Sequence, residues 1–190
     1  MFAGHFGLAA GVRAKSPEVP LWSLMLGTQL LDVVFVPLFL KGAETMDDRH
    51  GTGYGDFIIH AEYSHSLVSA LLLAFLAGLL AKRFWGRRAG RIMAGVVFSH
   101  WLLDLVVHRA DLPLLPGNLG HLPLLGLGAW KYEGLAIGLE ALVLVVGFAM
   151  YLRFVLAKSA GRSKTAAWLS GAVLGCLLAF SLLTDVLGLF

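Results

Sequence analysis

The stretch SHWLLDLVVHRAD, residues 99–111, combines the apolar character of a membrane helix with three polar side chains at intervals of four. His100, Asp104 and His108 would share one face of a helix, because residues four apart lie about 6 Å from each other on the same side. An imidazole and a carboxylate one turn apart can hold Zn²⁺ or another divalent cation. The stretch therefore predicts a membrane helix that carries a metal-binding pair, His100 with Asp104.

The composition of the whole chain agrees with a membrane location. Of its 190 residues, 58% are hydrophobic and only 14% are charged, and the mean hydropathy is +0.78. Soluble domains are about half apolar and about a quarter charged. Cys176 is the only cysteine, which excludes a disulfide framework and a cysteine-ligated metal site. The N-terminus does not resemble a cleaved signal peptide, because its apolar run begins at Met1 without a preceding basic region.

Several apolar segments are long enough to cross a bilayer, which takes ~20 residues in a helix. Four or five segments meet this requirement, roughly at residues 19–40, 64–81, 91–108, 134–156 and 165–190. The N-terminal MFAGHFGLAAGV is too short to span; it could lie in the interface or dip into the bundle as a half-helix. We therefore predict an all-α fold with one transmembrane domain over residues 1–190. It is a bundle of about five spans plus a short N-terminal half-helix.

The basic residues predict how the bundle is oriented. Eleven of the fifteen Lys and Arg residues fall on one side of the predicted spans: Arg13, Lys15, Lys82, Arg83, Arg87, Arg88, Arg91, Arg153, Lys158, Arg162 and Lys164. The other four are Lys41, Arg49, Arg109 and Lys131. Because positive loops face the cytoplasm, this pattern predicts cytoplasmic basic loops and an outside C-terminus. It also removes the reason to infer nucleic-acid binding from the net charge of +3.

Ionisable residues inside the predicted spans gather at one depth. Asp32, Asp104, Glu140 and Asp185 all lie within spans, where a charged group is costly and usually functional. With a rise of ~1.5 Å per residue, these acids and the histidines fall in the middle or outer half of the bilayer. Asp32, His65, His100 and Asp104 are therefore predicted to share one or two divalent ions.

A plainer interpretation exists for each of these residues taken singly. A lone histidine in a membrane more often joins helices through hydrogen bonds than binds a metal. Glu140 and Asp185 could be protonated acids that backbone or serine groups satisfy. Only the joint occurrence at one depth favours a metal site, and whether His108 and Asp185 belong to it stays open.

Four short motifs, in order, resemble a known family. They are GHFGLAAG at the N-terminus, LLDVV in the first span, HAEYSHSL at 60–67 and SHWLLDLV at 99–106. Together they resemble the LexA-regulated, membrane-bound metal-dependent hydrolases, small bacterial inner-membrane proteins. The likeness covers roughly residues 1–110. It departs from the family pattern at Leu31, Val34, Ala61 and Glu62, where the family has proline, aspartate, arginine and glycine.

The resemblance implies that His5 joins Asp32, His65, His100 and Asp104 as a metal ligand. The N-terminal segment would then enter the bundle from the cytoplasmic side, with Met1 deep and Arg13 at the exit. A helix of 12 residues reaches ~18 Å, far enough to lift His5 to the layer of His100. The resemblance also implies a metal-dependent hydrolase, with Zn²⁺ as the favoured ion and one or two ions bound.

We expect the substrate to be a membrane lipid or a lipid-like phosphate or acyl ester, reached from the outer half of the bilayer. Glu62, Glu140 and His60 are the candidate catalytic residues, as a general base or as groups that orient a ligand. Arg109 and Lys131 are the candidates to contact an anionic headgroup. Nothing in the sequence defines the oligomeric state.

Two other functions remain open at this level. The same residues could form a pathway for protons or divalent cations, since transporters use intramembrane Asp, Glu and His in that way. A conduit would, however, need polar residues at both depths of the membrane. The other alternative is a non-enzymatic membrane partner protein, in which the polar pairs only join helices.

Overall fold

The fold is known from a computed structural model, which describes residues 1–48, 57–159 and 163–188. Six α-helices form it, together with one two-stranded sheet and two short 3₁₀ helices in the described residues. In chain order they are α1 Phe2–Lys15, α2 Leu21–Thr28, α3 Leu30–Leu40, β1 Thr45–Asp48, β2 Phe57–His60, α4 Leu67–Val107, α5 Glu133–Lys158 and α6 Lys164–Val186, with 3₁₀ turns at Pro116–Asn118 and Ala129–Lys131. The predicted all-α class is confirmed.

Three helices are long and apolar enough to cross a membrane, namely α4, α5 and α6. A fourth candidate is the pair α2 and α3, if the two count as one broken span. The structure is thus consistent with a membrane protein, while the predicted number of five spans is not confirmed. The predicted spans 134–156 and 165–190 correspond to α5 and α6; residues 189–190, Arg49 and Arg162 lie outside the described residues.

The predicted first span, 19–40, is not a single helix. It breaks at Gln29, whose φ of −108° and ψ of 9° are not helical, and α2 and α3 meet at a bend of 50°. The break leaves the carbonyl of Thr28 available to a side chain outside the helix, and His100 uses it. Hydropathy did not reveal the break because both halves are apolar.

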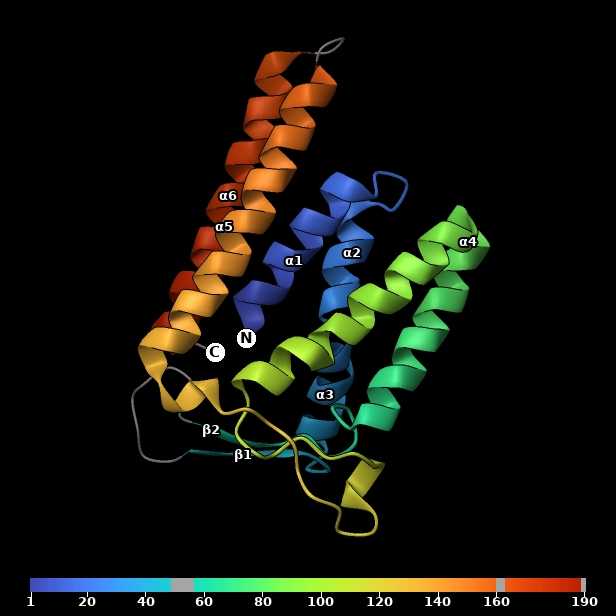
Figure 1. Cartoon of the computed structure of the whole chain (residues 1–190), viewed down its shortest axis with the longest axis vertical. Helices are drawn as coiled ribbons and strands as arrows, with labels where there is room; N and C mark the ends of the chain where they lie inside the picture. Colours follow the sequence, from blue (N-terminus) through green and yellow to red (C-terminus); the bar gives the residue numbers. More distant parts are fainter. Residues whose placement is uncertain (49–56, 160–162, 189–190) are drawn as a thin grey trace.

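The predicted loop between the second and third spans is also absent. Residues 67–107 run as one helical stretch, α4, in which only Gly86 leaves the helical region, with φ 88°. Glycine adopts this conformation without a Cβ clash, so a single residue folds the helix back on itself. Figure 1 shows the two arms of α4, and close contact between Gly78 and Gly90 joins them. The basic residues expected in a loop therefore lie on helical turns.

The N-terminal helix α1 lies inside the bundle. Half of its residues are buried, all of them small except His5: Ala3, Gly4, His5, Gly7, Ala9, Ala10 and Gly11. It packs against α5 most extensively, then against α2, α6 and α4. In the last turn of α1, Arg13 donates hydrogen bonds to the carbonyls of Pro17 and Val19. The sequence thus builds a short internal helix whose first turns can reach the centre of the protein (Figure 1).

The two ends of the bundle differ in character. The α1–α2 connection, the bend of α4, the end of α5 and the start of α6 lie at one end (Figure 1). Most of the basic residues in the described part of the chain belong to these segments. The β1–β2 hairpin and the 109–132 segment cover the other end. The 109–132 segment consists of turns and 3₁₀ helices, held by paired hydrogen bonds between Leu112 and Leu125. The hairpin was not predicted; it pairs Thr45 with His60 in antiparallel register.

Candidate metal centre

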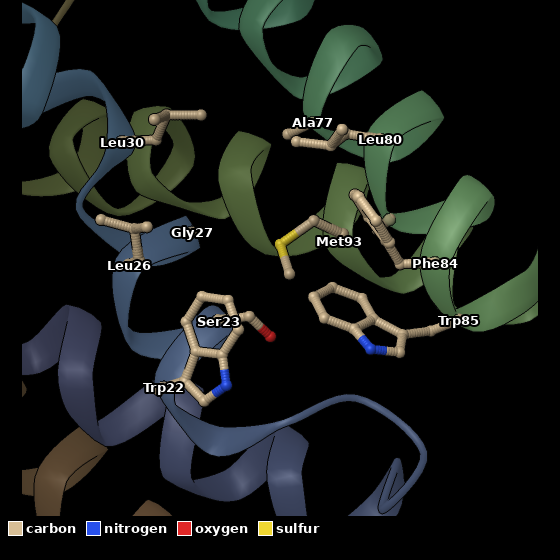
Figure 2. A pocket seen from close by; sticks show the side chains of 11 residues that line it. Trp22, Ser23, Leu26, Gly27, Leu30, Ala77, Leu80, Phe84, Trp85 and Met93 are labelled. Carbon is tan, nitrogen blue, oxygen red and sulfur yellow. The ribbon is translucent and has the colours of Figure 1, made fainter.

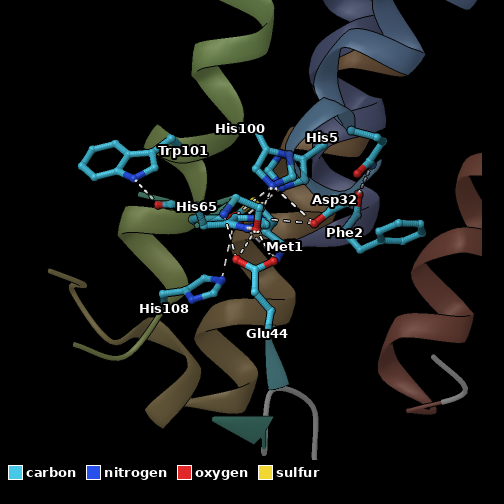
Figure 3. A network of polar contacts seen from close by, with 12 residues as sticks. Met1, Phe2, His5, Asp32, Glu44, His65, His100, Trp101 and His108 are labelled. Atoms are coloured by element: carbon cyan, nitrogen blue, oxygen red, sulfur yellow. Dashed lines mark hydrogen bonds and ion pairs between the residues drawn. The ribbon is translucent and has the colours of Figure 1, made fainter. Parts of the chain in front are cut away.

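The five predicted ligands converge in the structure, and Figure 3 shows His5, Asp32, His65 and His100 pointing toward one another. His5 comes from α1, Asp32 from α3, His65 from the turn before α4, and His100 and Asp104 from the second arm of α4. Their ligand atoms form two groups that could each hold a metal ion: His5 with His100 and Asp104, and Asp32 with His65 and His100. His100 is common to both groups, so it occupies the middle of the cluster.

The distances within this His–Asp cluster match those between ligands of a single ion. His100 Nε2 lies 3.0 Å from Asp104 Oδ2 and 3.7 Å from Asp32 Oδ1. His5 Nε2 lies 3.3 Å from Asp104 Oδ1, and His65 Nε2 lies 3.4 Å from Asp32 Oδ1. Four ligands placed ~2.0 Å from a tetrahedral ion stand about 3.3 Å apart. The cluster is therefore of the right size for an ion of the Zn²⁺ class.

The other ring nitrogens define which tautomer the histidines adopt. His100 Nδ1 lies 2.6 Å from the carbonyl oxygen of Thr28, which can only accept, so this nitrogen carries a proton. His65 Nδ1 lies 2.8 Å from Ser64 Oγ, and that hydroxyl lies within 3.0 Å of both Glu44 oxygens. Because the hydroxyl donates its one proton to Glu44, it must accept from His65. In both neutral rings the lone pair is then on Nε2, which points into the cluster.

When both rings are neutral, two lone pairs face each other, since His65 Nε2 and His100 Nε2 are only 3.2 Å apart. Two acceptors at this distance repel unless a cation or a proton lies between or beside them. Two carboxylates, Asp32 and Asp104, flank the same point. Metal-ligating histidines typically donate the outer N–H to a carbonyl or carboxylate in this way. The donor set therefore fits a divalent cation.

Burial shows from which side the cluster can be reached. His5, His65, His100 and Asp104 are all at least 95% buried. The side chain of Asp32 is 34% exposed. Among the five candidate ligands, access is therefore through the side of the cluster that α3 forms.

His108 also reaches the cluster. Its Nε2 lies 3.8 Å from Asp104 Oδ2, and its Nδ1 lies 2.9 Å from Asp111 Oδ1. The ring packs at 4.2 Å from the ring of Trp130. The spacing of four between His100, Asp104 and His108 had placed it on this face, and the structure brings it to the edge of the cluster, outside both metal groups.

The predicted catalytic residue Glu140 holds the helix that carries His5. Its Oε1 accepts a hydrogen bond of 2.8 Å from the backbone N–H of Gly4, and Asp185 Oδ2 accepts one of 3.0 Å from Ala3. The first N–H groups of a helix have no partner within the helix, and its dipole favours anions there. Glu140, a predicted catalytic residue, and Asp185, whose role was left open, thus meet at the start of α1, one turn from His5.

The other predicted catalytic residues lie elsewhere. His60 is on β2, with its side chain 45% exposed and its Nε2 3.0 Å from Asp47 Oδ2. Glu62 follows in the turn between β2 and α4, where its carbonyl accepts from the backbone of Gly117. Neither belongs to the two metal groups found among the described residues.

The two candidate headgroup contacts, Arg109 and Lys131, each follow a residue at the edge of the cluster in the sequence. Arg109 directly follows His108 and is partly buried. Lys131 directly follows Trp130, the residue that packs on His108, and is exposed. Both lie in the segment that covers this end of the bundle.

Sequence analysis missed the residues that orient the ligands: Thr28, Glu44, Ser64 and Asp111. Glu44 is 1% exposed and accepts hydrogen bonds from the backbone N–H groups of Tyr63 and Ser64, both at 2.8 Å. Glu44 and Ser64 are twenty positions apart, and no local spacing relates them. Asp111 could have been found, because it stands three residues after His108 at the end of a helix.

Replacing Glu44 by alanine is expected to weaken metal binding by ~10–100-fold, the usual effect of removing a group that orients a ligand. The loss leaves Ser64 without its acceptor and frees the ring of His65 to turn. Titration of the purified protein with Zn²⁺ measures the change. Glu133→Ala, an exposed acid at the start of α5, is the matched control and should bind as the wild type does. Equal affinities for both variants would contradict a role for Glu44.

Comparison with protein-family models, curated proteins and solved structures found no match. The fold and the site describe an all-α protein with helices able to cross a membrane and a buried His–Asp cluster that could hold a metal ion.

Proposed function

We propose that the protein is a membrane-embedded, metal-dependent hydrolase that acts on an amphiphilic ester, either a lipid or a lipid-linked phosphate or acyl ester. The observation that carries the proposal is the close approach of two buried imidazole Nε2 atoms, 3.2 Å apart, beside two carboxylates. Nothing in the packing of apolar helices requires this arrangement. Two unprotonated imidazole nitrogens at this distance beside two carboxylates cost free energy unless a metal ion or a proton lies between them, and a metal ion is what the donor set fits.

His5, Asp32, His65, His100 and Asp104 would hold one or two divalent ions, with Zn²⁺ favoured by the mixed imidazole and carboxylate donors. A divalent ion in such a site polarises a carbonyl or phosphoryl oxygen and makes water a stronger acid. Thr28, Ser64 and Glu44 keep the two central rings in the tautomer that ligation needs. The chain therefore supplies both the ligands and the groups that orient them.

His108 is the residue placed to move a proton during hydrolysis. Asp111 holds the Nδ1 proton of His108, so that Nε2 of the neutral ring can accept a proton on the cluster side. The carboxylate that orients an imidazole in this way also stabilises the protonated ring. The predicted candidates Glu62 and His60 have no comparable contact with the cluster among the described residues.

The depth of the site argues for a substrate that arrives through the bilayer. The cluster is enclosed except on the Asp32 side, where α3 carries exposed apolar side chains such as Val33, Val36 and Phe39. A lipid can approach along that helix, whereas a water-soluble substrate would have to cross the 109–132 cover. Arg109 and Lys131 in that cover would meet an anionic headgroup.

The proposed topology has five crossings: α2 with α3, the two arms of α4, α5 and α6. Each arm of α4 is about 20 residues long, enough for ~30 Å of bilayer. The end with most of the basic residues would face the cytoplasm, and the cluster would lie in the outer half of the bilayer. A bacterial inner membrane is the proposed location.

The test is hydrolysis by the purified full-length protein in mixed micelles. The substrates are phosphatidylglycerol, phosphatidic acid and a fluorogenic long-chain acyl ester, with released headgroup, phosphate or fluorophore as the readout. We expect turnover of one substrate that chelation abolishes and Zn²⁺ or Mn²⁺ restores. Asp104→Asn should show none, while Glu133→Gln should keep it.

Two results would contradict the proposal. Stoichiometric metal together with its uptake into proteoliposomes would indicate a transporter. No bound metal, with Asp104→Asn only less stable, would indicate that the cluster joins helices through protonated side chains.

A further inference from the structure

A second site lies at the basic end of the bundle, where an apolar groove runs between α2 and the first arm of α4 (Figure 2). Its volume is about 340 Å³, and apart from Ser23 all of its lining residues are apolar or glycine. The hydroxyl of Ser23 is bonded to the carbonyl of Pro20, so it offers no free polar group to an occupant.

Small residues keep the groove open. Gly27 forms part of the wall of α2, and a Cβ there would lie 2.7 Å from the sulfur of Met93. Opposite it, Ala77 and Ala81 present only methyl groups between the larger Leu80 and Phe84. Met93, from the second arm of α4, closes the floor and is 5% exposed. The groove is thus a feature of the helix packing.

Large apolar side chains form the rims and are left uncovered by the described chain. Trp22, Leu80 and Phe84 are each more than 60% exposed. Apolar cavities of this size do not hold ordered water, because water needs polar partners there. An occupant must therefore be apolar along its length, as a lipid acyl chain is.

Basic residues near one end of the groove indicate that the polar part of the occupant is anionic. Around the fold at Gly86 lie Lys82, Arg83, Arg87, Arg88 and Arg91, all of them exposed. Glu18, the acid that pairs with Arg88 at 3.0 Å, offsets only one of these charges. Trp22 and Trp85 meet edge to face at 6.0 Å at the same end, and tryptophan favours the headgroup level of a bilayer.

We propose that this groove binds an acyl chain of an anionic phospholipid, with the headgroup among Lys82, Arg83 and Arg87. A basic cluster beside a membrane helix attracts anionic lipids, and an apolar groove next to it holds the tail. None of the groove residues belongs to the His–Asp cluster, so this inference does not rest on the proposed hydrolase activity. It requires only that the groove faces lipid.

Tryptophan fluorescence tests the proposal, because Trp22 and Trp85 stand at the groove. The full-length Trp168→Phe protein is placed in nanodiscs of phosphatidylcholine and phosphatidylglycerol in a ratio of about three to one. This background removes the exposed tryptophan of α6, while Trp101 and Trp130 are at least 91% buried. Brominated acyl chains quench tryptophan fluorescence on contact. Two samples are compared, one with brominated phosphatidylcholine and one with brominated phosphatidylglycerol, and both contain the same total amount of bromine. We expect at least about twofold stronger quenching when phosphatidylglycerol carries it.

Two further variants locate the site. Ala77→Leu with Ala81→Leu fills the groove and should remove the preference, whereas Ala172→Leu, on the exposed face of α6, should keep it. Lys82→Gln with Arg83→Gln leaves the groove intact and should make the two lipids equal. Equal quenching by both lipids in the parent protein would overturn the proposal. A preference that survives both double variants would also overturn it, because the lipid would then be bound elsewhere.

Discussion

Alanine at position 100 is expected to reduce bound metal in the purified protein to background. His100 belongs to both groups of ligands, so its loss removes the central ligand whichever of the two groups holds the ion. Removing only an orienting group costs ~10–100-fold in affinity, and removing the shared ligand should cost more than about 100-fold. Elemental analysis of protein purified in detergent and exposed to Zn²⁺, Mn²⁺ or Fe²⁺ measures the change.

Substitutions of the outer ligands, His5 and Asp32, test whether the cluster holds one ion or two. His5→Ala removes a ligand from one group and Asp32→Asn from the other, so an ion held by only one group should be lost in one variant and kept in the other. With a single shared ion, both variants should lose most of the metal. His121→Asn is the control, because His121 is an exposed loop residue at φ 50°, a conformation that asparagine tolerates.

Thermal unfolding separates a metal site from a hydrogen-bonded cluster. A ligand at about 100 times its dissociation constant stabilises the folded state by ~2.7 kcal/mol. Chelation should therefore lower the Tm of the wild type and leave the Tm of His100→Ala unchanged. If chelation has no effect on the wild type, the metal interpretation is wrong, whatever the variant does to stability.

The second large effect is expected from Gly147→Ala, which should destabilise the protein and also reduce its metal content. Gly147 on α5 faces Gly7 on α1 so closely that a methyl group would overlap the carbonyl oxygen of Gly7. A backbone carbonyl cannot rotate away as a side chain can, so α1 must shift as a whole. Overpacking of this kind costs ~1–3 kcal/mol, and more where the neighbour is backbone.

The shift of α1 would carry His5 away from Asp104, because Gly7 lies only two residues after His5 on the same helix. Gly147 in turn lies two turns after Glu140, which holds the start of α1. We expect the His5 group to lose its metal first. Gly138→Ala, on the same helix, is the matched control: a Cβ there meets nothing within 4 Å. Alanine should stabilise that position by up to ~1 kcal/mol through helix propensity. Equal stability of the two variants, measured by unfolding in detergent, would show that α1 does not need this close approach.

The structure also explains why the polar residues of the spans have different roles. Asp104 and Glu140 are both buried acids on long apolar helices, and hydropathy cannot distinguish them. Asp104 meets four imidazoles, whereas Glu140 meets the backbone of Gly4. The difference depends on which helix lies opposite each acid. That depends in turn on the glycines that let α1 approach α5.

The sequence alone determined what depends on composition and on spacing within one helix: the helical class, the apolar segments, the basic end and the pairing of His100 with Asp104. These features are local, because hydrophobicity and the 3.6-residue repeat act over a few turns. Only the tertiary structure decided the break at Gln29, the fold at Gly86, the role of Glu44 and the facing of His65 with His100. Each of these joins residues twenty or more positions apart or depends on one backbone angle, and the packing of whole helices selects among many arrangements that the same pattern allows.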